Sequence, residues 1–264
     1  MTLTPQELKR YAQQIKLADI ALSGQTKLKQ ARVLCVGAGG LASILLPYLA
    51  AAGVGTLGIV DDDVVELSNL QRQVLYQTAH IGQNKAMLAK QQLLALNPEI
   101  TVQAYPSRLQ LSNAKELIES YDIVADCTDN FATRYLLHDI CYTLNKPCAY
   151  ASVSQFQGQC SLFQGANSAC FRCLFPTIPN NNCFANCSSD GVLGVLPGLL
   201  GVVQATEILK WILNLGELLI GRLLLVDSLA VTFQTYHITR NPECHVCAYQ
   251  QPLESLPTTS TSIV

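Results

Sequence analysis

Charged residues are scarce in this sequence. They make up 14% of the 264 residues, whereas about a quarter is usual for a soluble globular domain. The formal net charge is only -2, and no basic run occurs. Binding to nucleic acid or to an anionic membrane relies on clustered basic residues, so we expect neither partner. Apolar residues reach 49%, which predicts a large core and an apolar surface that meets a second copy in a homodimer.

The sequence also lacks an uninterrupted apolar stretch long enough to cross a membrane. The most apolar segment, residues 192–203, contains Pro197 and several glycines, and Gln204, Glu207 and Lys210 follow it. A spanning helix needs about 20 apolar residues. We therefore predict a buried core helix here rather than a membrane span.

Signs of a secreted, disulfide-bonded protein are missing as well. Residues 1–10 are polar rather than a hydrophobic signal, and the count of 11 cysteines is odd. These features favour a reducing compartment, so we expect a cytoplasmic protein. Single cysteines such as Cys35 and Cys141 are then small buried hydrophobic residues.

Apolar strands and helical segments alternate through the first 154 residues. This order predicts an α/β fold with a doubly wound, mostly parallel, Rossmann-like sheet. Further along the chain the pattern changes to strands for which we predict antiparallel pairing. We expect one domain over residues 1–249 and a disordered tail over residues 250–264, which are rich in proline, threonine and serine. The expected strands are residues 31–36, 56–60, 101–104, 123–126, 148–152, 158–163, 223–227 and 232–237.

Four cysteines form two pairs of identical spacing, Cys170-x-x-Cys173 and Cys244-x-x-Cys247. Two such pairs supply the thiolates of a tetrahedral Zn²⁺ site when the fold brings them together. Because all four positions are cysteines, no coordination position stays open for water, and the site would be structural. A redox role for a C-x-x-C pair is the alternative.

A glycine turn follows the first predicted strand and reads Gly37-Ala38-Gly39-Gly40. Glycines at the start of a helix let the backbone approach phosphate groups. Asp61 ends the next predicted strand, at a distance that suits hydrogen bonding to a ribose hydroxyl. The turn and its acid predict a nucleotide site, with a turn that binds nothing as the alternative.

Cationic residues follow the acid. Residues 68–73 read Ser-Asn-Leu-Gln-Arg-Gln, and Lys85 opens the next predicted helix. Arg72 and Lys85 suit a triphosphate, whose charge they can neutralise during transfer. A nicotinamide site has less need of a pair of cations, so an NAD-dependent oxidoreductase is the weaker interpretation. Taken alone, the two residues could also belong to a solvated face.

Asp129 lies just beyond the predicted strand 123–126. Open α/β sheets place their ligand crevice at the carboxyl ends of the strands, so Asp129 is a candidate site residue. The alternative is that the Asp129-Asn130 step caps the following helix.

Taken in order, these motifs resemble the ThiF/MoeB family, the bacterial relatives of ubiquitin-activating enzymes. The resemblance covers about residues 8–248. Residues 17–25 and 186–191 are more similar to the thiamine-pathway branch, ThiF, than to the molybdopterin branch. The resemblance implies a nucleotide-binding half over about residues 30–154. A half that holds the zinc and the carrier protein would cover residues 155–249.

The resemblance implies adenylyltransferase activity. The protein would bind Mg-ATP and the Gly-Gly tail of a ubiquitin-fold sulfur-carrier protein. It would join the tail carboxylate to AMP and release pyrophosphate. The adenylate would then accept sulfur from a separate donor protein and become a thiocarboxylate. The expected carrier is that of the thiamine pathway, and the alternatives are the molybdopterin carrier or a peptide.

The resemblance also assigns individual roles. Arg72 and Lys85 would act with Asn69 on the triphosphate, Asp129 would position Mg²⁺, and Asp61 would hold the ribose. The full set implied to bind Mg-ATP is Gly37, Gly39, Gly40, Asp61, Asp63, Asn69, Arg72, Gln73, Lys85 and Asp129.

Cys187 is a candidate nucleophile. In the thiamine branch, a cysteine in the matching Asn-Cys-x-x-x-Gly context links covalently to the carrier tail. Such a role requires a lowered thiol pKa. The alternative is an incidental loop cysteine, and the nearby Cys183 could serve instead.

Two positions depart from the family pattern. The family string Arg-Tyr-x-Arg-Gln reads here Arg-Tyr-Ala-Gln-Gln, with Gln13 at the second arginine. That arginine reaches across the dimer to the triphosphate in the family, and glutamine cannot replace a bidentate cation. A binding protein that keeps the fold without catalysis is therefore a competing hypothesis. Ala42 replaces the last glycine of the turn, a change that the dinucleotide-binding pattern tolerates.

Overall fold

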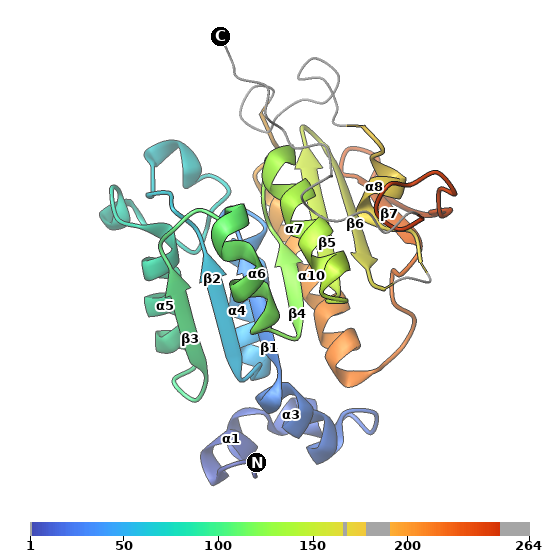
Figure 1. Ribbon diagram of the computed structural model, residues 1–264. Coiled ribbons are helices and arrows are strands. Elements are labelled where there is room, and N and C mark those ends of the chain that lie inside the picture. Colours follow the sequence, from blue (N-terminus) through green and yellow to red (C-terminus); the bar gives the residue numbers. More distant parts are fainter. Residues whose placement is uncertain (1, 166–167, 178–190, 249–264) are drawn as a thin grey trace.

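The computed structural model describes residues 2–165, 168–177 and 191–248. Its centre is an eight-stranded sheet with the order β3-β2-β1-β4-β5-β6-β7-β8 (Figure 1). The first five strands of this order pair in parallel, and β6, β7 and β8 add antiparallel neighbours. The predicted fold class is thereby confirmed. The strands are β1 (Arg32–Val36), β2 (Thr56–Val60), β3 (Thr101–Tyr105), β4 (Ile123–Asp126), β5 (Cys148–Ser154), β6 (Gln157–Phe163), β7 (Arg222–Asp227) and β8 (Thr232–His237).

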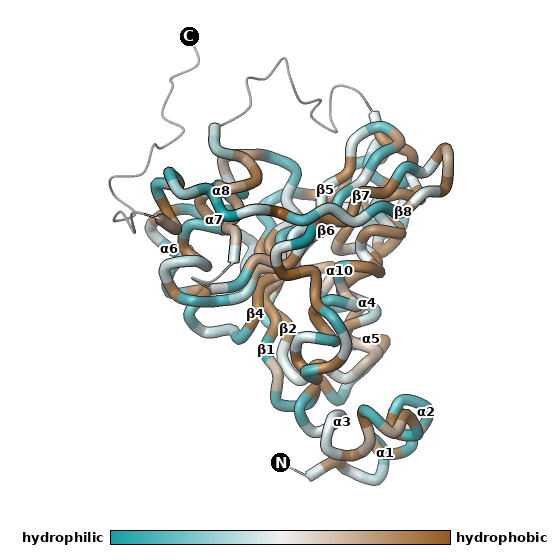
Figure 2. The backbone as a smooth tube through the Cα atoms, turned by 90° about the vertical axis from the view of Figure 1, so that its right-hand side faces the viewer, coloured by the Kyte–Doolittle hydropathy of each residue, from teal (hydrophilic) through white to brown (hydrophobic). Residues whose placement is uncertain are grey.

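Helices cover both faces of the parallel part. On one face α4 and α5 pack with α10 against alternate strand residues such as Val33 and Ile59. On the other face, α6 and α7 cover the remaining alternate residues of the strands, such as Leu34 and Val124. Figure 2 shows the central strands mainly in brown, as expected for a parallel sheet buried on both faces. The helices are α1 (Pro5–Arg10), α2 (Ala12–Ile15), α3 (Ala21–Gln30), α4 (Ala42–Ala52), α5 (Lys85–Leu96), α6 (Leu111–Glu119), α7 (Phe131–Thr143), α8 (Phe171–Leu174) and α10 (Val195–Leu213).

The helices α1, α2 and α3 lie beyond the amino ends of the parallel strands (Figures 1 and 2). A capping box opens α1: the Thr4 side chain accepts from the Glu7 backbone N–H, and the Glu7 carboxylate accepts from the Thr4 N–H. Glu7 also pairs with Lys29 of α3 at 2.7 Å. These contacts tie the N-terminal segment to the domain.

The helix α10 is long and apolar enough to cross a membrane by length and composition alone. A core helix passes the same test, and α10 packs against α3, α4, β5 and β6. It extends about ten residues beyond the predicted segment because its polar residues are buried with partners. Gln204 donates to the carbonyls of Asp126 and Ala149 at 2.8 and 2.7 Å. The Glu207 carboxylate accepts from the Leu219 N–H and pairs with Lys210.

Glycines allow α10 to approach α4 closely. A Cβ added at Gly201 would lie 2.4 Å from the carbonyl oxygen of Leu41, which is fixed backbone. At Gly198, on the same helix, the first atom met would be Ile44 Cγ1 at 3.5 Å, an ordinary contact.

We predict opposite effects for alanine at these two glycines. Gly201→Ala should lower the free energy of unfolding by about 1–3 kcal/mol, since the overlap outweighs the helix propensity gained. Gly198→Ala should raise it by up to about 1 kcal/mol. Guanidinium unfolding of both variants measures the difference. Equal effects would contradict the close packing of α10 on the start of α4.

Candidate functional site

A cavity of about 270 Å³ lies at the carboxyl edge of the parallel sheet. Loops that follow β3, β2, β1 and β4 line it, together with Val153 of β5 and the start of α10. The order of the strands reverses at β1, whose neighbours are β2 and β4. Crevices at such a switch point are the usual ligand sites of open α/β sheets.

Three glycines shape the turn that follows β1. Gly37 has a φ of 92°, and a Cβ there would lie 2.6 Å from the Cys127 carbonyl oxygen. A Cβ at Gly40 would lie 2.9 Å from Pro197 Cβ. Gly37 and Gly40 thus let β4 and α10 approach the turn. At Gly39 the first atom that a Cβ would meet is Gln73 Nε2 at 3.6 Å, so Gly39 leaves the backbone open toward the cavity.

Asp61 fixes the glycine turn. Its carboxylate accepts hydrogen bonds from the backbone N–H groups of Ala38 at 2.6 Å and Asp63 at 2.8 Å. Burial raises the pKa of Asp61 above its ordinary value, although these two donors and Lys85 oppose the shift. Asp61 lines the cavity, so the ribose role predicted for it is compatible with its position.

Tyr76 supports the same turn, and no sequence motif pointed to it. Its buried hydroxyl lies 2.8 Å from the Ala38 carbonyl oxygen and 3.2 Å from that of Lys85. Burial raises the pKa of Tyr76 well above its ordinary value, so the hydroxyl stays a donor. Tyr76 thereby joins the glycine turn to the first residue of α5.

The two predicted cations both line the cavity. Lys85 is buried, and its ammonium group pairs with the exposed Asp63 carboxylate at 3.1 Å. Arg72 donates to the Ser68 carbonyl at 3.1 Å and makes no ion pair with a described residue. The cations and the open Gly39 backbone fit a triphosphate.

The remaining predicted residues fall into different positions. Asp129 is exposed and lines the cavity, while Asn130 caps α7 by accepting from the Thr133 N–H. Gln73 also lines it, and its buried Oε1 has no hydrogen-bond partner. Asn69 is buried outside the lining, with its Oδ1 3.3 Å from the Glu66 backbone N. Its predicted contact with the triphosphate stays a prediction.

Residues without a motif complete the lining. Ser107 and Arg108 follow β3, and Arg134 lies on α7. Arg134 is 6% exposed, and it donates to the Thr128 carbonyl at 2.6 Å. No spacing rule connects these side chains with the glycine turn, because the order of strands in the sheet brings them there.

The departures from the family pattern are placed as follows. Gln13 is exposed on α2, at the opposite end of the sheet from the cavity, and Lys16 donates to it at 3.4 Å. Ala42 is fully buried in the core cluster, so its methyl group is accommodated. Cys183 and Cys187 lie outside the described residues, and the covalent role of Cys187 stays a prediction.

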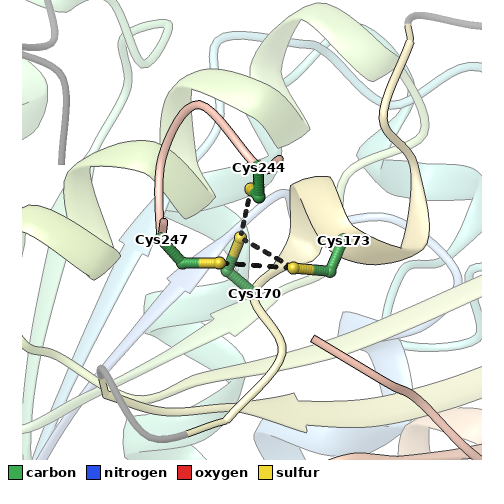
Figure 3. Close-up of side chains that lie close together, drawn as sticks. All are labelled: Cys170, Cys173, Cys244 and Cys247. Carbon is green, nitrogen blue, oxygen red and sulfur yellow. Dashed lines mark hydrogen bonds between the residues drawn. The ribbon is translucent and has the colours of Figure 1, made fainter. Parts of the chain in front are cut away.

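The four paired cysteines form one cluster (Figure 3). Their sulfur atoms all lie within 4.8 Å of one another, and neighbouring sulfurs are 3.3–3.8 Å apart. Tetrahedral Zn²⁺ with bonds of about 2.3 Å holds sulfurs about 3.8 Å apart, whereas a disulfide requires about 2.05 Å. The donor set and spacing therefore fit a tetrahedral metal ion better than a disulfide.

Known proteins match the chain over most of its length. A model of the ThiF family matches residues 11–246. The sulfur carrier protein adenylyltransferase of Thermus thermophilus is 46% identical over 252 residues, which are 94% of this chain and 93% of that protein. The probable molybdopterin-synthase adenylyltransferase of Porphyra purpurea is 45% identical over 90% of this chain and 62% of its own length.

A solved structure shares the fold. The crystal structure of E. coli MccB with MccA-N7isoASN has a TM-score of 0.80 and 22% identity, and covers 91% of this chain and 74% of that one. At this identity the likeness concerns the fold alone.

We predict that the cysteine cluster holds one metal ion per chain. Cys244→Ser should abolish metal content and lower the unfolding temperature by roughly 10 °C, because the metal links two distant segments. Elemental analysis and thermal unfolding measure both effects. The control is Cys160→Ala, which alters a buried cysteine outside the cluster and should retain the metal. A metal-free chain of unchanged unfolding temperature would contradict the prediction.

Proposed function

Because this chain belongs to the ThiF family of adenylyltransferases, we propose that its substrate is the sulfur carrier protein of the thiamine pathway. The observation that carries the activity is the cavity itself, because the open Gly39 backbone and the cations Arg72 and Lys85 all line it. This site suits transfer of AMP from ATP to the C-terminal Gly-Gly carboxylate of such a carrier. The support for the thiamine pathway is the sequence of residues 17–25 and 186–191, and the alternatives are the molybdopterin carrier or a peptide.

The proposed reaction needs little proton transfer. A carboxylate oxygen of the tail attacks the α-phosphorus of ATP, and the bond to the β-phosphate oxygen breaks. Pyrophosphate leaves with the electron pair of that bond, and an acyl-adenylate remains. Since the nucleophile is already an anion, the protein has to orient two negatively charged groups and neutralise their charge.

The cavity residues have distinct proposed roles in this reaction. Arg72 and Lys85 would hold the phosphates, Asp61 would hold the ribose, and Asp129 would hold a Mg²⁺ ion. The proposed roles of Gln73 and Asp63 are to order these groups. Neutralisation of the leaving pyrophosphate is the chemistry that Mg²⁺ supplies.

The metal and the protein partners are also proposals. The cysteine cluster fits Zn²⁺ in a structural role. Sulfur comes from a separate donor protein in this scheme. The proposed assembly is a homodimer, which the exposed apolar side chains Val195, Leu199 and Val202 of α10 support. A monomer in sedimentation at micromolar concentration would contradict it.

ATP–pyrophosphate exchange tests the activity. The purified chain, with magnesium and candidate carriers that end in Gly-Gly, should exchange label only with its own carrier. Asp129→Ala should slow exchange about 100- to 1000-fold through loss of charge stabilisation. The matched control is Asp62→Ala, which removes another exposed acid that lines the cavity and has no assigned role, and which should cost much less. Absence of exchange with every carrier, from a folded chain, would contradict the proposal.

Gln13→Arg should accelerate exchange by about tenfold or more, because a second copy would then place a bidentate cation near the triphosphate. The comparison variant is Gln13→Lys, which adds charge without the planar fork and should gain less. The exchange rates of the wild type and the two variants are compared at a protein concentration at which sedimentation shows a dimer. Equal rates would exclude a catalytic contribution from this position.

A further inference from the structure

Arg134 is a buried cation whose guanidinium group is not paired directly with a carboxylate of the described residues. It is 6% exposed and makes no ion pair with any residue in the described parts of the chain. Its guanidinium donates to the Thr128 carbonyl at 2.6 Å and to Ser152 Oγ at 3.4 Å, and its Nε has no partner. The rings of Phe131 and Tyr150 each lie 5.6 Å from its central carbon. Burial of such a charge is costly unless an anion compensates it.

A second buried arginine shows what Arg134 lacks. Arg172 has a similar exposure, and Asp139 accepts three hydrogen bonds from its guanidinium at 2.7–3.1 Å. For Arg134 the neighbouring carboxylate, Asp126, is already engaged. Asp126 accepts from Thr128 through one oxygen and pairs with His138 through the other. The fold therefore satisfies Arg172 internally and leaves Arg134 for a ligand.

The position of Arg134 in the cavity indicates which anionic group of a ligand it would meet. The cavity crosses the strand ends in the order β3, β2, β1, β4, β5. Asp61 follows β2, and the glycine turn follows β1, so ribose and phosphates occupy the first part of this path. Arg134 lies past them, beside the ends of β4 and β5, where it contacts Thr128 and Ser152. Lys85 and Arg72 line the side of the glycine turn instead.

We propose that Arg134 binds the C-terminal carboxylate of the carrier protein. This inference rests on the proposed function and names a substrate-binding residue for it. The guanidinium group, which lines the cavity, donates to one carboxylate oxygen, and the second oxygen stays free to attack the α-phosphorus. The cation also offsets the repulsion between the carboxylate and the triphosphate. Anchoring through Thr128, Phe131 and Tyr150 keeps the guanidinium in place before the tail arrives.

Calorimetry with two forms of the carrier tests this proposal. The carrier that supports exchange is prepared with its native C-terminal carboxylate and with a C-terminal carboxamide. The wild-type chain should bind the carboxylate form about 10- to 100-fold more tightly, as expected for a hydrogen bond to a charged group. Arg134→Gln should bind both forms alike, at the affinity of the carboxamide. It should also bind a non-hydrolysable ATP analogue within about threefold of wild type.

Arg108→Gln is the matched control, because Arg108 lines the opposite end of the cavity, after β3. This variant should retain the preference for the carboxylate. If Arg134→Gln does not fold, Arg134→Lys replaces it; lysine keeps the charge without the planar fork of donors, so the preference should still shrink.

Three results would overturn the role of Arg134. The first is equal binding of both carrier forms by the wild type. The second is an undiminished preference of the folded Arg134 variant for the carboxylate form. The third is a large loss of that variant's affinity for the ATP analogue. Each leaves the adenylyltransferase activity intact, because the carrier was chosen by exchange. Failure of the exchange assay with all carriers would contradict the proposed function itself, which separates the two conclusions.

Discussion

The close approach of three backbone segments at the switch point of the sheet is the constraint on which the site depends. Gly37 lies against the carbonyl of Cys127, Gly40 against Pro197, and Gly201 against the carbonyl of Leu41. Any side chain larger than hydrogen at these positions would separate the turn after β1 from β4 and α10. Because of this packing, the loops of neighbouring strands share one cavity, and cations from different segments face a single volume.

Buried polar groups fix the second side of the cavity. Gln204 of α10 donates to carbonyls of β4 and β5, and so joins a helix to the last parallel pair of strands. Asp126 accepts from Thr128, whose carbonyl in turn accepts from Arg134. Burial alone would raise the pKa of Asp126, but its hydrogen bond with His138 and the nearby Arg134 bring that pKa below its ordinary value. The carboxylate therefore stays ionised and keeps this chain of contacts intact.

The sequence predicted the framework of the fold better than the details of the cavity. The alternation of apolar segments and turn residues located β2, β4 and β8 to the residue. The ends of β2 coincide with Gly55 and Asp61, and those of β4 with Asp122 and Asp126. The extent of α10 was underestimated, because hydropathy cannot distinguish a buried, hydrogen-bonded Gln204 from an exposed one. Tyr76 and Arg134 were missed for a related reason: their contacts depend on tertiary packing, and neither belongs to a spacing pattern that sequence alone reveals.

The cysteine cluster also has a consequence for the order in which the protein forms. Its two halves are 74 residues apart in the chain, between Cys170 and Cys244. The intervening chain includes α10, β7 and β8. During synthesis the first two thiols leave the ribosome long before the last two, so a metal ion can acquire its complete ligand set only after the eight strands of the sheet have been made. A crosslink across such a loop removes about 4 kcal/mol of chain entropy from the unfolded state. Metal supply would thus act as a checkpoint of maturation, after the nucleotide-binding strands have already been made.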